Sequence, residues 1–510
     1  GGVWAGDIYL YAEYAAQLLR NGVNPYQYDM FDAFRAFRAH QVFITPLLHN
    51  DVHGALSYPP LAFIVLIPFQ ILGMNSIYVY LIFLVLAFIV IFFGSPSYLR
   101  PLVLLPFFIN TDYIGFSLNG VSDAVWVFLV LMMILRWRHE KERAVWFGLV
   151  CAYKQQPWLL APYLLIRLWY DYDTIRDRLR AMLVFAAISG GIFMAFNLPF
   201  ILWDAQAWFR GVSDNFLDGI IITGVGLSRL TELGVVNMSK AAYSMLMLAV
   251  YGVSIFLYWR HFHRWREVMW ILPGIVFWFG YRGLTHYWMF WLMPLMFALL
   301  RNMFRAAVET SQAQNCVRNW RPSAAALAGL SALLIGTIGY YALRPSPVTL
   351  SLDGPIYAVG DYVNQINLIV RNNSDEVMTP RFSVRSRFLH QPLFWEIEQG
   401  PETVGPGEQA SYTIKGAGPA IDFYYRDGYT SAWPAYDFYY RDGAEIVGSA
   451  AIERYGDAGL LRSVVVDPAY RGRGLGAGVE VDDRAREAAG DGHAPGEGRA
   501  EVGRAPPDQL

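Results

Sequence analysis

Residues 77–93 read Ile-Tyr-Val-Tyr-Leu-Ile-Phe-Leu-Val-Leu-Ala-Phe-Ile-Val-Ile-Phe-Phe, a run of seventeen residues without one charged side chain. An apolar run that approaches about 20 residues is typical of a helix that crosses a lipid bilayer. The composition of the whole chain supports the same prediction: 55% of its 510 residues are hydrophobic and only 16% are charged. In soluble domains about 25% of the residues are charged. The sequence therefore predicts a membrane-embedded chain and excludes a purely soluble one.

Further apolar segments lie on both sides of this run. With it, the series comprises 60–73, 77–93, 100–117, 120–136, 144–156, 157–169, 180–202, 239–259, 266–281, 284–301 and 323–343. Pro68, Pro106 and Pro157 are expected to kink or break their helices. Segment 60–73 is expected to be re-entrant or to merge with its neighbour. The predicted fold class is mainly α, a polytopic membrane protein of about 10–11 helical segments.

The basic residues predict which ends face the cytoplasm. The turns that follow 136, 169, 259 and 301 are rich in arginine, whereas the alternate turns carry few basic residues. By the positive-inside rule, 119–123, 154–157, 203–238 and 281–286 then face outward. The chain is thus expected in the cell membrane, with membrane lipids as partners. Its net charge of −2 argues against nucleic acid as a partner, and its two cysteines, Cys151 and Cys316, argue against a disulfide scaffold.

The composition changes after residue 345. Residues 346–421 alternate apolar and polar side chains between turn signals, which predicts a small β-sandwich. Since segment 323–343 should cross outward, the sandwich is expected outside. A junction at 422–443 holds the heptapeptide Asp-Phe-Tyr-Tyr-Arg-Asp-Gly twice, at 422–428 and 437–443. The Gly- and Pro-rich residues 491–510 are predicted to be disordered.

Several polar residues fall on the predicted outer side of the first 345 residues. Residues 1–58 are amphipathic, with a helix expected over 7–20 that Asn21-Gly22 stops. Lysine is scarce, with four against thirty-six arginines, so Lys154 inside an apolar segment stands out. Arg282 and His286 also lie at this side. Charged side chains at membrane depth are costly and usually functional.

The order of these residues resembles a known family. Gly6-Asp7, Asn24-Pro25, Ser57-Tyr58-Pro59-Pro60, Gly120-Val-Ser-Asp123, Ala152-Tyr-Lys154-Gln-Gln-Pro157, Asn197-Leu-Pro199 and Arg282 with His286-Tyr287 occur in that order. Over residues 1–345 the set resembles the GT-C glycosyltransferases that use polyprenyl-phosphate sugars, in particular the GT87-like mannosyltransferases. The resemblance also implies a first transmembrane helix before Asp7, so an N-terminal truncation is expected.

The resemblance implies an activity and roles. Asp7 matches the catalytic base, and Lys154, Arg282, His286, Asp123 and Tyr58 would bind the substrate and its phosphate. The donor would be a polyprenyl-phosphate sugar such as polyprenyl-phosphate mannose. A glycan, lipid or protein would accept the sugar with inversion, and no metal or further cofactor is required.

Chemistry supports these residue types. A base must take the proton of the acceptor hydroxyl, and a leaving phosphate needs cations and donors.

Structural roles and other functions stay open at this point. Asp7 would suit the first turn of a helix, Asp123 a helix cap, Lys154 an ion pair, Arg282 a loop end, and His286 a hydrogen-bonded structural position. A transporter or flippase of a lipid-linked substrate would use the same outer charges without any chemistry.

A second motif lies near the C-terminus. A predicted strand at 460–466 leads through Asp467-Pro468 to Arg471-Gly-Arg-Gly474-Leu-Gly476. This resembles the GNAT N-acetyltransferases, in which Arg471, Gly474 and Gly476 would match the acetyl-CoA motif; backbone N–H groups of such a turn cradle a pyrophosphate. The domain, at 444–490, is expected to be a partial α/β fragment of a chimera. Acetyl-CoA is a cofactor, and N-acetyl transfer a minor alternative function, only if this fragment works.

Overall fold

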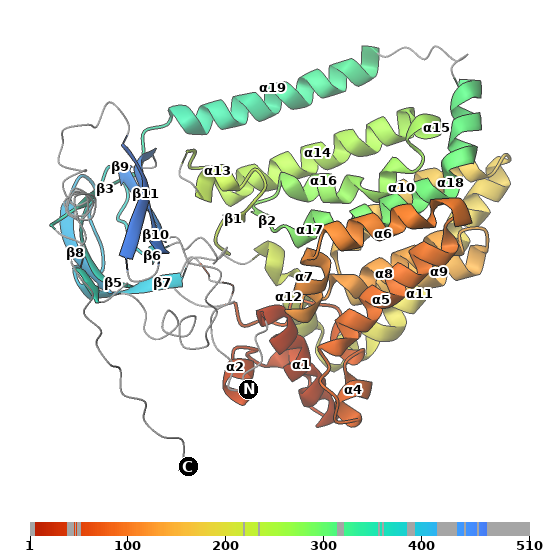
Figure 1. Cartoon of the computed structure of the whole chain (residues 1–510), viewed down its shortest axis with the longest axis horizontal. Helices are drawn as coiled ribbons and strands as arrows, with labels where there is room; N and C mark the ends of the chain where they lie inside the picture. The colour runs from red at the N-terminus through yellow and green to blue at the C-terminus, as the bar shows by residue number, and fades with distance from the viewer. Residues whose placement is uncertain are drawn as a thin grey trace, which may run out of the picture.

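The computed structural model covers the whole chain and describes residues 6–37, 45, 47, 53–217, 220–232, 235–313, 321–354, 357–359, 362–384, 393–415, 436–442, 445–455 and 458–466. A helical body is followed by antiparallel strands that lie beside one end of it (Figure 1). Arg471, Gly474 and Gly476, the first copy of the duplicated heptapeptide and the predicted disordered tail lie outside the described residues.

The first helix, α1 (Asp7–Arg20), has the bounds that the sequence predicts. It ends because Asn21 leaves the helical conformation and Gly22 takes a φ of +75°, which favours glycine. One face of α1, with Leu10, Ala15 and Ala16, is buried in the main core. The short η1 (Pro25–Gln27) and α2 (Asp32–Ala36) follow.

The predicted apolar segments are helical, but several are broken into shorter pieces. The remaining helices are α3 (Leu61–Ile64), α4 (Ile67–Ile71), α5 (Tyr78–Gly94), η2 (Ser97–Leu99), α6 (Arg100–Ile109), α7 (Asp112–Leu118), α8 (Asp123–Leu135), α9 (Glu140–Tyr153), η3 (Gln156–Leu160), α10 (Ala161–Asp171), α11 (Ile175–Trp203), α12 (Ala205–Leu217), α13 (Arg229–Glu232), α14 (Lys240–Arg260), α15 (Phe262–Trp265), η4 (Val268–Trp270), α16 (Leu272–Trp278), α17 (His286–Met289), α18 (Leu292–Ala313) and α19 (Arg321–Leu343). Prolines account for part of this, because Pro68 and Pro157 stand in the first turns of α4 and η3. Pro106 lies inside α6, and that segment breaks only after Ile109.

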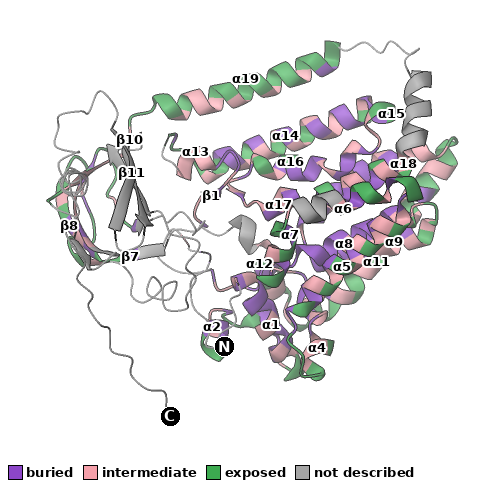
Figure 2. Ribbon diagram, in the orientation of Figure 1, coloured by how far each residue is buried: buried purple, intermediate pink, exposed green. Residues whose placement is uncertain are grey.

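Three of the described helices are long and apolar enough to cross a membrane: α11, α14 and α19. A fourth candidate is the pair of α7 and α8, which is bent by 119° at the residues between them. Figure 2 shows α8 largely buried, whereas α19 is mostly exposed. A membrane protein is therefore supported by helix length and composition, and a larger number of spans stays a prediction.

The strands after α19 form a small antiparallel sheet. Its members are β3 (Val348–Leu352), β4 (Tyr357–Val359), β5 (Tyr362–Asn372), β6 (Phe382–Val384), β7 (Leu393–Gln399) and β8 (Gln409–Lys415). They are paired in the order β3-β5-β8-β7-β6, with β4 on β5. Ile366 and Val370 of β5 point into a core with Trp395 and Tyr412. In place of the two sheets of the predicted sandwich, the described strands thus follow one hydrogen-bonded path.

A separate three-stranded sheet has the order β11-β10-β9. Its strands are β9 (Tyr436–Asp442), β10 (Glu445–Tyr455) and β11 (Ala458–Val466). β9 contains most of the second copy of the duplicated heptapeptide. β11 contains the strand predicted before the Arg471 motif, and its pairing with β10 shifts by one residue between Ala451 and Ile452.

Candidate functional site

Asp123 occupies the first turn of α8, directly after the sharp bend from α7. The bend depends on Gly120, whose φ of +84° is in the region that favours glycine. The side chain of Asp123 is fully buried. A wholly buried carboxylate needs partners, because removing its charge from water is expensive.

Lys154 is the first of these partners. It follows α9 in an extended conformation (φ −151°, ψ 148°), and Pro157 shortly after it sits in the first turn of η3. From this break the Lys154 ammonium lies 2.8 Å from Asp123 Oδ1 and 3.5 Å from the hydroxyl of Ser122. The ion pair that was one of the structural alternatives for Lys154 is thus present, and it is buried.

His286, the first residue of α17, approaches the same carboxylate from the other side. Its Nε2 lies 3.8 Å from Asp123 Oδ2. Its ring stands edge-to-face against the rings of Phe116, at 5.8 Å, and Tyr287, at 4.6 Å. The indole N–H of Trp126 donates to Asp123 Oδ1. Asp123 is therefore shared between an ammonium, an indole and an imidazole.

Asp7 and Arg282 form a second group, joined by Thr45. The Thr45 hydroxyl donates to Asp7 Oδ2 at 2.6 Å, and Arg282 Nη2 donates to the Thr45 hydroxyl at 3.0 Å. The other oxygen of Asp7 accepts the backbone N–H of Ile8 at 2.8 Å. Asp7 thus has both the helix-terminal position of the structural alternative and a contact path to an arginine.

A two-stranded parallel bridge fixes Arg282. β1 (Thr223–Gly224) pairs with β2 (Arg282–Gly283), and Val225 N donates to Gly283 O at 2.8 Å. Gly224 has a φ of +142°, and a Cβ there would lie 2.6 Å from the backbone of Gly283. Only glycine permits this approach, so β1 holds the residue next to Arg282 in place.

Tyr58 lies between the two groups. The Lys154 ammonium is 5.6 Å from the centre of its ring, a cation–π distance. Tyr58 is also close enough to Asp7, Arg282 and Asp123 to interact electrostatically with each. Burial raises the pKa of the Tyr58 hydroxyl well above its ordinary value, so this residue is a neutral donor or acceptor.

The segment that carries Tyr58 is anchored through its own carbonyl groups. Tyr11 OH donates to His53 O at 2.7 Å, Gln155 Nε2 donates to Ser57 O at 2.5 Å, and Tyr26 OH donates to Tyr58 O at 2.6 Å. His53 N donates to Thr45 O at 2.8 Å, which ties this segment to the Asp7 group. His53 Nε2 and the Ser57 hydroxyl are also hydrogen-bonded.

The structure therefore brings together all six residues selected in the membrane half: Asp7, Tyr58, Asp123, Lys154, Arg282 and His286. They come from α1, the loop before α3, α8, the break after α9 and the 282–286 segment. Sequence reasoning missed Thr45, His53, Ser57 and Trp126. Ser57 stood inside a quoted motif, but nothing in the sequence marked Thr45, whose role depends on the path of a loop.

The charges define what this group can do. Two cations, Lys154 and Arg282, stand near two carboxylates, and His286 can add a positive charge. Such a group can accept a proton at Asp7 and stabilise an anion at the cations. Among the described residues, no three His, Cys, Asp or Glu side chains are grouped to hold a metal ion.

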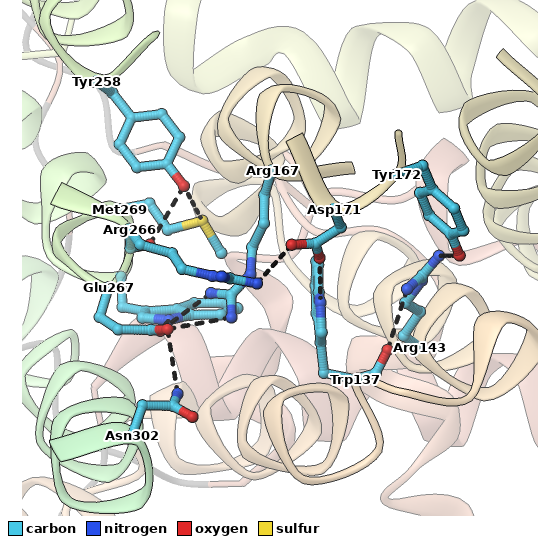
Figure 3. Close-up of polar contacts among 11 residues, drawn as sticks. Trp137, Arg143, Arg167, Asp171, Tyr172, Tyr258, Arg266, Glu267, Met269 and Asn302 are labelled. Carbon is cyan, nitrogen blue, oxygen red and sulfur yellow. Dashed lines mark hydrogen bonds and ion pairs between the residues drawn. The ribbon is translucent and has the colours of Figure 1, made fainter. Parts of the chain in front are cut away.

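A second buried polar network, drawn in Figure 3, has a different character. Arg167 makes a two-pronged pair with Glu267 at 3.0 and 3.1 Å, and its guanidinium lies 4.5 Å from the centre of the Trp137 ring. Arg266 pairs with Asp171 at 2.5 Å, and the Trp137 indole donates to the same carboxylate at 2.8 Å. Each acid has a cation, and the contacts join α10 to the segment before α16. We assign this network to helix packing.

Comparison with known proteins concerns the C-terminal part. Residues 407–487 match the family model described as the acetyltransferase (GNAT) family. No curated protein and no solved structure matches the chain. The match supports an acetyltransferase, which is a transferase of another kind than the glycosyltransferase predicted from residues 1–345, and it gives that earlier resemblance no support.

The matched residues differ from the predicted bounds of the GNAT-like fragment. The sequence placed the GNAT-like fragment at 444–490, whereas the match begins at residue 407. It therefore includes β8, which is paired with β5 and β7 in the six-stranded sheet. The predicted sandwich and the GNAT-like region consequently share a strand, and alternation of side chains could not reveal this overlap.

Proposed function

We propose that residues 1–345 form a membrane glycosyltransferase. It transfers a sugar such as mannose from a polyprenyl-phosphate carrier to an acceptor hydroxyl on the extracytoplasmic face, with inversion. One observation carries this proposal: a carboxylate suited to a base and three groups suited to a phosphate come from three separate segments, which are α1, the break after α9 and the 282–286 segment, to one place. Charged side chains at membrane depth are costly and are usually functional.

The mechanism is a single displacement. The acceptor hydroxyl gives its proton to the Asp7 carboxylate while its oxygen bonds to the anomeric carbon of the sugar. The bond between that carbon and the phosphate oxygen breaks, and the lipid phosphate leaves with the electron pair. Lys154, Arg282 and His286 stabilise the negative charge of this leaving group. Thr45 keeps the base and Arg282 at a fixed separation.

The sidedness of the proposal follows from charge. The Arg-rich turns, including those of the Figure 3 network, would face the cytoplasm by the positive-inside rule. Then α19, which lies along α14, leads outward to β3, and the sheet and the site share the extracytoplasmic side. The chain would be a multi-pass protein of the cell membrane that meets its lipid-linked donor there.

The experiment that tests this function uses membranes that contain the full chain and a series of radiolabelled polyprenyl-phosphate sugars. Transfer to an acceptor, with the anomeric configuration inverted in the product, is the expected result. Movement of a fluorescent lipid-linked sugar across proteoliposomes, without any transfer across the whole series, would favour the transporter or flippase instead.

A second candidate function is acetyl transfer by the C-terminal region. The family match over 407–487 favours it, as do the three strands that precede Arg471, Gly474 and Gly476. A turn with these residues would bind the pyrophosphate of acetyl-CoA through backbone N–H groups. The test is acetyl-CoA binding by the full chain beside a Gly474→Trp variant. Equal or absent binding in both would end this candidate.

A further inference from the structure

We propose that Asp123 is a positioning residue, which holds Lys154 and His286 as a pair of cations that face one anion. This inference rests on the proposed function, because the anion is the phosphate of the lipid carrier. It changes the role of Asp123 from a substrate-binding residue to one that acts through its two neighbours.

The two oxygens of Asp123 have separate partners. Oδ1 accepts from the Lys154 ammonium at 2.8 Å and from the Trp126 indole. Oδ2 lies 3.8 Å from His286 Nε2 and accepts no hydrogen bond from any residue that the structure describes. Trp126 is itself buried and packs against Trp291, with ring centres 4.5 Å apart. The carboxylate is therefore fixed between its two basic neighbours.

Each of the three residues stands where a helix begins or ends. Asp123 follows the bend before α8, Lys154 follows α9, and His286 opens α17. No rigid helix runs from one of them to another, so their separation depends on direct contact. Because two neighbouring cations repel, a carboxylate between them lets both stay buried at lower cost.

Charge matches the proposed ligand. With His286 protonated, the three side chains carry one net positive charge, and a phosphodiester carries one negative charge. The groups near the His286 ring include the carboxylate of Asp123 and the rings of Phe116 and Tyr287. The charges of Arg282 and Asp7 act on Tyr287. Asp123 is the carboxylate in direct contact, so its removal should be felt first by His286.

The test is a pH titration of the histidine ring signals of the purified full chain by NMR, with His286 assigned through a His286→Gln variant. The chain has nine histidines. In Asp123→Asn the midpoint of the His286 titration should fall by about one pH unit, because a nearby carboxylate favours the imidazolium. Asp123→Glu should stay near the parent, and Asp112→Asn, at an exposed acid of α7, should leave the midpoint unchanged.

A second variant guards against misfolding. Asp123→Asn leaves the Lys154 charge buried without its carboxylate, whereas Asp123→Asn with Lys154→Gln removes both charges. In this double variant the His286 midpoint should fall by less than in Asp123→Asn, because loss of the ammonium offsets part of the loss of the carboxylate. The same midpoint in the parent and in both variants would overturn the positioning role.

Binding supplies the other half of the test. Undecaprenyl phosphate, which carries no sugar, should bind Asp123→Asn about 10-fold more weakly than the parent, because Lys154 is then no longer held in place and His286 loses the carboxylate that favours its charged form. Equal binding by the parent and by Asp123→Asn would overturn the proposal that Lys154 and His286 face one anion. Neither measurement needs turnover, so a failure of the glycosyltransferase proposal would appear separately, as an absence of sugar transfer by the parent.

Discussion

Lys154 Nζ lies 2.8 Å from Asp123 Oδ1, and the two side chains are 3% and 0% exposed. This pair joins the break after α9 to the bend before α8, two irregular points of an otherwise helical body. Buried ion pairs add little net stability, but loss of one partner is costly because the other charge stays buried. The pair therefore fixes the geometry of the site more than it stabilises the fold.

Removing one partner of this pair should destabilise the chain. We expect Lys154→Met to lower the free energy of unfolding by about 3–5 kcal/mol, since Asp123 then keeps a buried charge without its ammonium. Lys154→Met combined with Asp123→Asn should recover most of that loss. Thermal unfolding of both variants in one detergent measures the difference. A double variant as unstable as the single one would contradict this view of the pair.

Glu13 should make stability depend on pH. Burial raises the pKa of this carboxyl, and the Ser76 hydroxyl, which donates to it, offsets the effect only partly. The folded state then binds the proton more tightly than the unfolded state, so stability is full below the unfolded pKa of about 4.5 and falls as pH rises through the folded value. Melting temperatures across this range should fall less in Glu13→Gln. Parallel curves for parent and variant would exclude Glu13 as the cause.

The close approach of β1 to β2 should leave no room for a side chain at residue 224. Gly224→Ala would place a Cβ 2.6 Å from Gly283 and strain a φ of +142°, at a cost of about 1–3 kcal/mol. Because β2 carries Arg282, the affinity for the polyprenyl-phosphate sugar should fall as well. Gly252→Ala in α14 is the control: its Cβ meets nothing within 4 Å, and it should be neutral or stabilising by up to about 1 kcal/mol. Comparable unfolding curves for the two variants would refute the close-approach argument.

Tyr58 should act through its ring more than through its hydroxyl. Tyr58→Phe keeps the aromatic face 5.6 Å from the Lys154 ammonium, whereas Tyr58→Ala removes it. Cation–π contacts of about 0.5–2 kcal/mol correspond to a roughly 2- to 30-fold change in affinity. Donor binding should therefore stay near the parent in the Phe variant and weaken in the Ala variant. The reverse order would assign the role to the hydroxyl.

The sequence was most informative where local signals are strong. The bounds of α1 follow from Asp7 at its start and Asn21-Gly22 at its end, and most apolar segments are helical as predicted. Breaks such as the one after Ile109 were not located, because Pro106 does not coincide with the end of α6. The strands could be predicted from the alternation of apolar and polar side chains, but the pairing of the strands could not. The order of the six-stranded sheet therefore had to come from the structure. The overlap of the predicted sandwich with the GNAT-like region at β8 was likewise not visible in the sequence.

The candidate site, like the fold, was predictable only in part. Polar residues in apolar surroundings could be selected one by one, since their burial costs free energy unless a partner or a function offsets it. Which of them touch could not be deduced: Asp123 and Lys154 are 31 residues apart, and Thr45, which bonds Asp7, lies 237 residues from Arg282. The contact partners of a loop residue depend on the whole fold.

The central claim is that Asp7 is the base of a sugar transfer, and one measurement tests it most directly. Transfer from radiolabelled polyprenyl-phosphate mannose is compared in membranes that contain the parent, Asp7→Asn or Asp32→Asn at matched amounts. Asp32 is an exposed acid of α2 and serves as the control. Transfer by the parent and by Asp32→Asn, with a loss of at least about 100-fold in Asp7→Asn and retained binding of the donor, is the predicted result. Equal transfer by the parent and Asp7→Asn would contradict the claim.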